Sequence, residues 1–182
     1  MSLVVTVDGE EKHGKTSFGM TFPKPLLVLA LDIGGVQRAE WRFQEHMGKD
    51  IFVHEFSLPM QTENTLADIA GLSKLKAMIG KTAAKTKPPI IKGTAELWYE
   101  FLTVYVSCLE NEYTPEGRTE PVNFATLLVD TGTSMWQLCA RGVLQEKQVR
   151  AAADGKYRER LQQIEYSEPN ARMLAFLQAA RE

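Results

Sequence analysis

A glycine-rich segment near the start of the chain has the residue types and the spacing of a phosphate-binding loop. Residues 9–16 read GEEKHGKT, which fits G-x-x-x-x-G-K-[ST], and they follow the apolar run LVVTV at 3–7. Glycines in such a loop let successive backbone N–H groups converge on phosphate oxygens. Lys15 would contact the β- and γ-phosphates of a nucleotide, and the Thr16 hydroxyl would bind Mg²⁺. We expect these residues to bind the nucleotide: Gly9, Glu10, Glu11, Lys12, His13, Gly14, Lys15, Thr16 and Ser17.

Two acidic residues, Glu10 and Glu11, occupy free positions of this loop. They are compatible with a polyphosphate because the backbone N–H groups face the ligand and side chains at these positions can point away. The alternative is a glycine-rich turn in which Lys15 and Thr16 stand together by chance. An apolar run before the loop and a helix-compatible segment after it favour the phosphate loop.

A second acidic residue suited to the metal follows another apolar run. Asp130 ends the segment TLLVD at 126–130. A strand that ends in an aspartate is typical of Walker B segments, in which the carboxylate holds Mg²⁺ through a water. Many strands also end in Asp because it initiates a turn or caps a helix. Together with the loop at 9–16, the pattern predicts that Thr16 and Asp130 are the metal-binding residues.

Asp32 ends a third apolar run, LLVLALD at 26–32, and is followed by Ile33-Gly34-Gly35. Ligands of open α/β sheets bind at the carboxyl ends of the strands, which places Asp32 on the same edge as the loop and Asp130. Three roles remain open for it: a general base for the attacking water, a polar contact, or a turn initiator. Our candidate catalytic residues are therefore Lys15 and Asp32.

Apolar periodicity predicts strands that alternate with helices, which indicates an α/β domain with a mainly parallel sheet. No repeat or linker divides residues 1–182, so we expect one domain. The expected strands are residues 3–7, 26–32, 51–58 and 124–130. The expected helices are residues 15–22, 36–48, 64–79, 94–111, and 133 to the end of the chain with breaks near 154 and 167.

The composition narrows the classes of partner. A formal net charge of −2 gives no global attraction to nucleic acid, so any DNA contact must come from a local patch. No apolar run approaches the roughly 18 residues that span a bilayer, and no signal-peptide pattern precedes residues 3–7. We therefore expect a cytoplasmic protein that does not contact membranes. Cys108 and Cys139 lack CxxC spacing and are expected to be buried, reduced thiols.

The three strand ends together resemble those of RecA-like P-loop ATPases, and more closely the phage nucleotide-binding proteins of that class, the Sak-type ATPases that assist single-strand annealing. The similar segments are FPKPLLVLALD (22–32), LLVDTGTSMW (127–136) and EYSEPNARMLAFL (165–177). The resemblance implies a RecA-like three-layer sandwich, binding of ATP and Mg²⁺, and ATP hydrolysis. It also implies homo-oligomeric assembly and a role in DNA recombination, with single-stranded DNA and a single-strand binding or annealing protein as partners, in the cytoplasm of a bacterium or phage-infected host.

Two departures from that family's pattern affect these expectations. RecA-like enzymes usually carry a catalytic glutamate where this chain has Gly34, so Asp32 or a later acid such as Glu40 would have to serve. The family also usually inserts a further strand between the phosphate-loop strand and the Walker B strand, and residue 182 precedes it. We therefore expect a chain that is truncated at its C-terminus relative to the family. The candidate arginine fingers are Arg141, Arg150, Arg158 and Arg160.

Two other functions remain open. A P-loop kinase or phosphotransferase would place 126–130 beside 3–7 and could use RAAADGKYRER (150–160) as a lid; a nucleotide-binding module could assemble without hydrolysis. Trp41 and Trp136 could stack on a DNA base, although core packing is the expected role of both. The lysines that could touch DNA phosphates are Lys74, Lys76, Lys81, Lys85 and Lys87.

Overall fold

The computed structural model describes residues 3–10, 13–57 and 92–181. Strands and helices alternate through most of this part of the chain, as the periodicity predicts. The elements, in order, are α1 (Lys15–Gly19), β1 (Leu26–Ala30), α2 (Ile33–Glu40), β2 (Ile51–Glu55), α4 (Thr94–Leu109), β3 (Thr126–Asp130), α5 (Gly132–Ala153), the 3-10 helix η1 (Gln163–Tyr166) and α6 (Ser167–Ala179).

The three strands form a parallel sheet in the order β2-β1-β3. Leu26 is in register with Ile51 on one side and with Thr126 on the other. All five residues of β1 are fully buried, which agrees with its uninterrupted apolar sequence. Because the strands are parallel, the residues that follow β1 and β3 lie at the same edge of the sheet.

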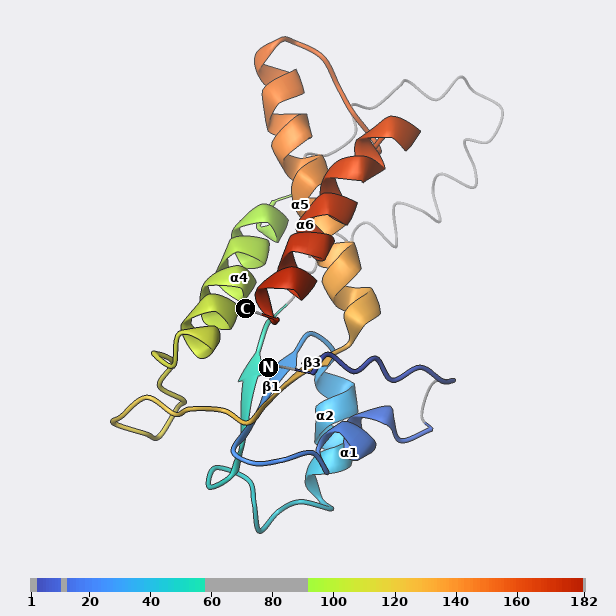
Figure 1. Cartoon of the computed structure of the whole chain (residues 1–182). Helices are drawn as coiled ribbons and strands as arrows, with labels where there is room; N and C mark the ends of the chain where they lie inside the picture. Colours follow the sequence, from blue (N-terminus) through green and yellow to red (C-terminus); the bar gives the residue numbers. More distant parts are fainter. Residues whose placement is uncertain (1–2, 11–12, 58–91, 182) are drawn as a thin grey trace, which may run out of the picture.

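Helices cover both faces of the sheet and make three layers (Figure 1). Successive β1 side chains point to opposite faces. Leu27 and Leu29 belong to the larger core cluster, with Trp98 and Phe101 of α4, Leu138 of α5 and Phe176 of α6. On the other face, Leu26, Val28 and Ala30 pack with Met20 beyond α1 and with Val36 and Ala39 of α2. The predicted α/β P-loop-type architecture is confirmed.

The predicted strand at residues 3–7 is wrong in this structure. These residues form no strand, and Leu3 and Val5 are 85% and 50% exposed. An apolar sequence alone does not make a strand: the second edge of β3 has no partner among the described residues, and residues 3–7 do not pair with it. Residues 126–129 are accordingly only half-buried.

The same observation bears on the order of strands. The kinase arrangement, with 126–130 paired beside 3–7, is not found in the described residues. The RecA-like arrangement separates these two segments by another strand, and it agrees with their lack of pairing here. Whether the chain is truncated relative to the family stays a prediction.

Element boundaries differ from the predictions mainly at their ends. Helix α1 stops at Gly19, and α2 ends at Glu40, well before residue 48. Helix α4 matches its prediction closely, and α5 ends at Ala153 just before Gly155, whose φ is +70°. The predicted helix at 64–79 and the lysines proposed for DNA contact lie outside the described residues.

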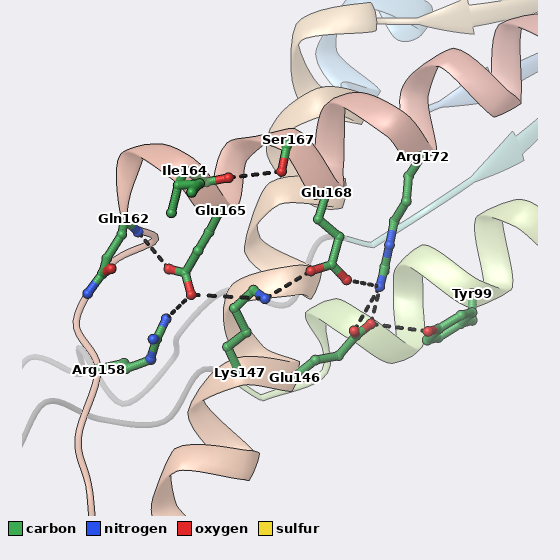
Figure 2. A network of polar contacts seen from close by, with 10 residues as sticks. All are labelled: Tyr99, Glu146, Lys147, Arg158, Gln162, Ile164, Glu165, Ser167, Glu168 and Arg172. Atoms are coloured by element: carbon green, nitrogen blue, oxygen red, sulfur yellow. Dashed lines mark hydrogen bonds and ion pairs between the residues drawn. The ribbon is translucent and has the colours of Figure 1, made fainter.

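Polar contacts fix the helical layer above the larger core cluster (Figure 2). Arg172 of α6 donates two hydrogen bonds to the carboxylate of Glu146 on α5, at 3.0 and 2.8 Å, and Tyr99 of α4 donates to the same carboxylate at 3.1 Å. Lys147 pairs with Glu168 at 2.9 Å. These contacts hold α4, α5 and α6 as one unit, far along α5 from its start at the sheet edge (Figure 1).

The predicted environment of the cysteines is confirmed and that of one tryptophan is not. Cys108 and Cys139 are buried and free. Trp136 is partly buried and stacks on Tyr166, with ring centroids 6.1 Å apart. Trp41, which follows α2, is 64% exposed, so the prediction that it packs in the core is wrong. None of the described helices is long and apolar enough to cross a membrane.

Candidate nucleotide site

A hydrogen bond between residues 114 positions apart forms the centre of the site. The hydroxyl of Thr16, in the first turn of α1, donates to Oδ2 of Asp130 at 3.0 Å. Asp130 is the last residue of β3 and is only 7% exposed. The fold therefore brings together the two residues that the sequence predicts as metal-binding.

The charge of Asp130 is poorly compensated by the protein itself. Burial raises the pKa of its carboxyl group above the ordinary value, while the hydrogen bond from Thr16 lowers that pKa. The negative charge of Asp32 raises it further, and the positive charges of Arg38 and Lys15 lower it. A buried carboxylate in this balance gains from a bound cation, because a cation offsets the desolvation of its charged form.

Helix α2 begins directly against this pair. A Cβ atom placed on Gly35 would lie 2.6 Å from Oδ2 of Asp130 and 3.2 Å from Oγ1 of Thr16. Only a residue without a side chain fits here without displacing one of those groups. Gly35 is not among the site residues predicted from the sequence, although its position after the acidic end of a strand is a signal for it.

Asp32 caps α2, since its Oδ1 accepts a hydrogen bond from the backbone N–H of Gly34 at 3.1 Å. This local hydrogen bond to the backbone is what the turn-initiator role predicts, while the roles of general base and polar contact stay predictions. Oδ2 of Asp32 accepts no hydrogen bond from the residues that the structure describes, and the side chain is exposed. Its effect on Asp130 places it within electrostatic range of the Thr16–Asp130 pair.

Lys15 is folded back on its own loop. Its ammonium group donates to the backbone carbonyl oxygens of Gly9 at 2.6 Å and Glu10 at 2.7 Å. Gly14, the residue before α1, has a φ of +82°, a left-handed conformation that favours glycine. No side chain caps α1, so the backbone N–H groups of its first turn are left for another partner.

The remaining loop residues are less well defined. His13 lies 3.7 Å from a carboxylate oxygen of Glu10, and both side chains are exposed. Ser17 follows Thr16 in α1. Glu11 and Lys12 lie outside the described residues, so the structure describes residues 9–10 and 13–17 of the predicted loop.

Comparison with known families agrees with this geometry. The family model of an AAA domain matches residues 1–182, the whole of the sequence. The chain belongs to the AAA domain family. No curated protein and no solved structure matches it.

Membership of this family supports a nucleotide-binding domain of the P-loop ATPase type. The arrangement described above places a hydroxyl and a buried carboxylate together at the end of the predicted loop. Mg²⁺ prefers oxygen ligands and binds through one or two protein groups together with phosphate oxygens and waters. Thr16 and Asp130 supply two such groups, and the described residues contain no cluster of three or more His, Cys, Asp or Glu side chains that could hold a metal alone. These residues therefore fit a magnesium ion bound with a nucleotide.

Two of the candidate arginine fingers, Arg150 and Arg158, lie away from this pair. Arg150 stands near the end of α5, which starts at Gly132 beside Asp130. At 1.5 Å per residue, Arg150 is about 27 Å along the helix axis from that start. Arg158, beyond it, forms an ion pair with Glu165 that belongs to the network of Figure 2. Within one chain, residues 150–160 therefore do not cover the Thr16–Asp130 pair.

Proposed function

We propose that this AAA domain binds ATP together with Mg²⁺ in the loop at 9–17 and hydrolyses it. The observation that carries the proposal is the 3.0 Å hydrogen bond between Thr16 and Asp130, which joins the end of the loop to the end of a buried strand. A chance Gly-Lys-Thr turn would have no reason to place its threonine against a buried carboxylate. The metal-side geometry of a phosphate-loop site gives that reason.

Each residue has a specific role in this proposal. Lys15 leaves the carbonyl oxygens of Gly9 and Glu10 and contacts the β- and γ-phosphates. Thr16 and Asp130 hold Mg²⁺, which supplies positive charge to the phosphate oxygens. Asp32 accepts the proton of the water that attacks the γ-phosphorus, as the bond to the β-phosphate oxygen breaks and ADP leaves.

Binding is tested by calorimetric titration of ATP, with and without Mg²⁺, into the wild-type chain and Lys15→Ala. We expect Lys15→Ala to lose at least about tenfold in affinity because a charge-assisted contact is removed. Lys156→Ala is the matched control, since Lys156 is an exposed lysine beyond the far end of α5. Equal affinities of wild type and Lys15→Ala would refute the assignment of the loop.

Binding without hydrolysis is the second candidate. It is favoured by Gly34, which occupies the position of the usual catalytic glutamate, and by the use of one Asp32 oxygen as a helix cap. Measurement of ATP turnover separates the two candidates. Turnover that falls at least about tenfold in Asp32→Asn would support hydrolysis with Asp32 as the base, whereas tight binding with no turnover in wild type would support the assembly module.

We further propose that the ATPase acts on single-stranded DNA as a homo-oligomer in the cytoplasm of a bacterium or phage-infected host, with a single-strand binding or annealing protein as partner. Support comes from the resemblance to phage annealing ATPases and from Trp41. The Trp41 side chain is 64% exposed, and the guanidinium carbon of Arg42 lies over its ring, 5.1 Å from the ring centre. An exposed aromatic ring beside a cation suits a stacked base and its phosphate.

Single-stranded DNA should therefore stimulate ATP turnover, and Trp41→Ala should weaken DNA binding by about fivefold or more, since stacking on one base contributes about 1–3 kcal/mol. Tyr157→Ala is the control, because it removes an exposed aromatic ring from the distal part of the helical layer. Phosphate transfer to a small acceptor with no effect of DNA would support the kinase alternative instead.

A further inference from the structure

An arginine of α2 lies at the site without a structural role that accounts for it. Arg38 is in the last turn of α2, where a cation normally interacts with the negative end of the helix dipole. Its guanidinium group is instead folded back to the first turn. A Cβ placed on Gly34 would lie 3.1 Å from Nη1 of Arg38, which puts the guanidinium beside the glycine that precedes Gly35.

The guanidinium group lies on the same side of α2 as Asp32 and acts electrostatically on Asp130. The same Cβ position on Gly34 lies 3.4 Å from Oδ1 of Asp32, so Arg38 and Asp32 flank one glycine. A Cβ placed on the neighbouring glycine, Gly35, would lie 2.6 Å from Oδ2 of Asp130 and 3.2 Å from Oγ1 of Thr16. Gly34, which lies beside Arg38, and Gly35, which faces Thr16 and Asp130, are consecutive residues of α2. The Arg38 guanidinium is therefore close to the Thr16–Asp130 pair, and its charge lowers the pKa of Asp130.

The guanidinium group is also available. Arg38 is exposed, and among the described residues it forms neither a hydrogen bond nor an ion pair with any side chain or backbone group. This distinguishes it from Arg158 and Arg172, whose guanidinium groups are used by carboxylates of the helical layer. A planar guanidinium without a partner is suited to two parallel hydrogen bonds with phosphate oxygens.

We propose that Arg38 binds the terminal phosphate of the nucleoside triphosphate, and so allows the site to distinguish ATP from ADP within a single chain. Lys15 approaches the phosphates from the loop, and Arg38 approaches them from α2 on the side of Asp32 and Asp130. Arg38 acts in this way only if the loop binds ATP as proposed above. The ADP-bound state lacks the phosphate that Arg38 contacts.

Titration calorimetry with two ligands tests this role: ADP with Mg²⁺, and an ATP analogue with a non-hydrolysable β–γ linkage with Mg²⁺. In Arg38→Ala we expect affinity for the triphosphate to fall about ten- to one-hundredfold, while affinity for ADP changes less than about twofold. Arg38→Lys should recover part of the loss, since it restores the charge but not the planar fork. The melting temperature should be unchanged because Arg38 contacts no described partner.

Lys49→Ala is the matched control. It removes one exposed positive charge just before β2, at the amino ends of the strands and so at the edge of the sheet opposite the site. Equal losses for both ligands in Arg38→Ala, equal losses in Lys49→Ala, or no loss at all would each overturn the role of Arg38. Failure of the proposed function is distinguishable, because the wild-type chain would then bind neither ligand, and the role of Arg38 would be overturned with it.

Discussion

Replacement of Gly35 by alanine should weaken the binding of ATP with Mg²⁺ without destabilising α2. The new Cβ would lie 2.6 Å from Oδ2 of Asp130, whereas ordinary contacts of this kind begin near 3.4 Å. Either the carboxylate or the helix must therefore move by about 0.8 Å. A shift of this size disturbs the 3.0 Å hydrogen bond between Thr16 and Asp130, and so misplaces the carboxylate that would hold a water of the metal.

The expected size of the functional effect follows from the role of Asp130. Changes to groups that position metal ligands cost about 10- to 100-fold in metal affinity or activity. We expect a loss of that order in the affinity for ATP measured with Mg²⁺, and a much smaller loss without Mg²⁺. Alanine is favoured over glycine in a helix by about 1 kcal/mol, so α2 itself should not be weakened by the change in propensity.

The assay is calorimetric titration of ATP with and without Mg²⁺, together with a thermal melt followed by circular dichroism. Gly132→Ala is the matched control: it makes the same substitution in the first turn of α5, two residues after Asp130, and its Cβ would meet no atom within 4 Å. The reasoning is refuted if Gly35→Ala binds ATP as wild type does with the same dependence on Mg²⁺, or if Gly132→Ala loses as much affinity.

Three further predictions concern the buried acid, the helical layer and the thiols. Asp130→Asn should abolish the increase in melting temperature that Mg²⁺ gives with ATP. A control variant, Asp154→Asn at the far end of α5, should keep that increase. A normal increase in Asp130→Asn would contradict the metal-binding role. The pKa of Glu146 lies below its usual value chiefly because of the hydrogen bonds from Arg172, so the stability that this pair contributes is present above about pH 4.5 and is lost as the pH falls through the lowered pKa. Between about pH 5 and 3 the free energy of unfolding should therefore fall by about 1 kcal/mol more in wild type than in Glu146→Gln, and parallel curves would count against this account. Burial raises the pKa of Cys108 to about 12 and that of Cys139 to about 11. Neither thiol should therefore react with a disulfide reagent at pH 8 within minutes in the native chain, while both should react in denaturant. Rapid labelling of the native protein would show that the core is not closed.

The core of the site is predictable from sequence because its parts obey local rules. The spacing of Gly9, Gly14, Lys15 and Thr16 defines a loop conformation, and the parallel sheet brings the end of one strand close to the ends of the others. These two rules are enough to pair Asp130 with Thr16. The sequence does not decide the role of Asp32, because an acid at a strand end can either cap a helix or face a ligand.

Other features of the site and the fold depend on pairing and packing between segments that are far apart in the sequence, and no local sequence pattern predicts these contacts. Residues 3–7 have a strand-like sequence, but they do not pair with the open edge of β3, so an apolar run alone does not specify strand pairing. Gly35 and Arg38 matter because α2 packs against Asp130, and no periodicity indicates that contact. The large aromatic ring of Trp41 favours the core, yet this residue follows the end of α2 on an exposed turn.

The central claim is that the loop and β3 form one site for a nucleotide and its metal. A crystal structure of the chain with Mg²⁺ and a non-hydrolysable ATP analogue tests it most directly. We predict Mg²⁺ at about 2.1 Å from Oγ1 of Thr16, with the carboxylate of Asp130 contacting a water of the metal and the Lys15 ammonium on the phosphates. A nucleotide bound elsewhere, or a metal that contacts neither Thr16 nor a water held by Asp130, would contradict it.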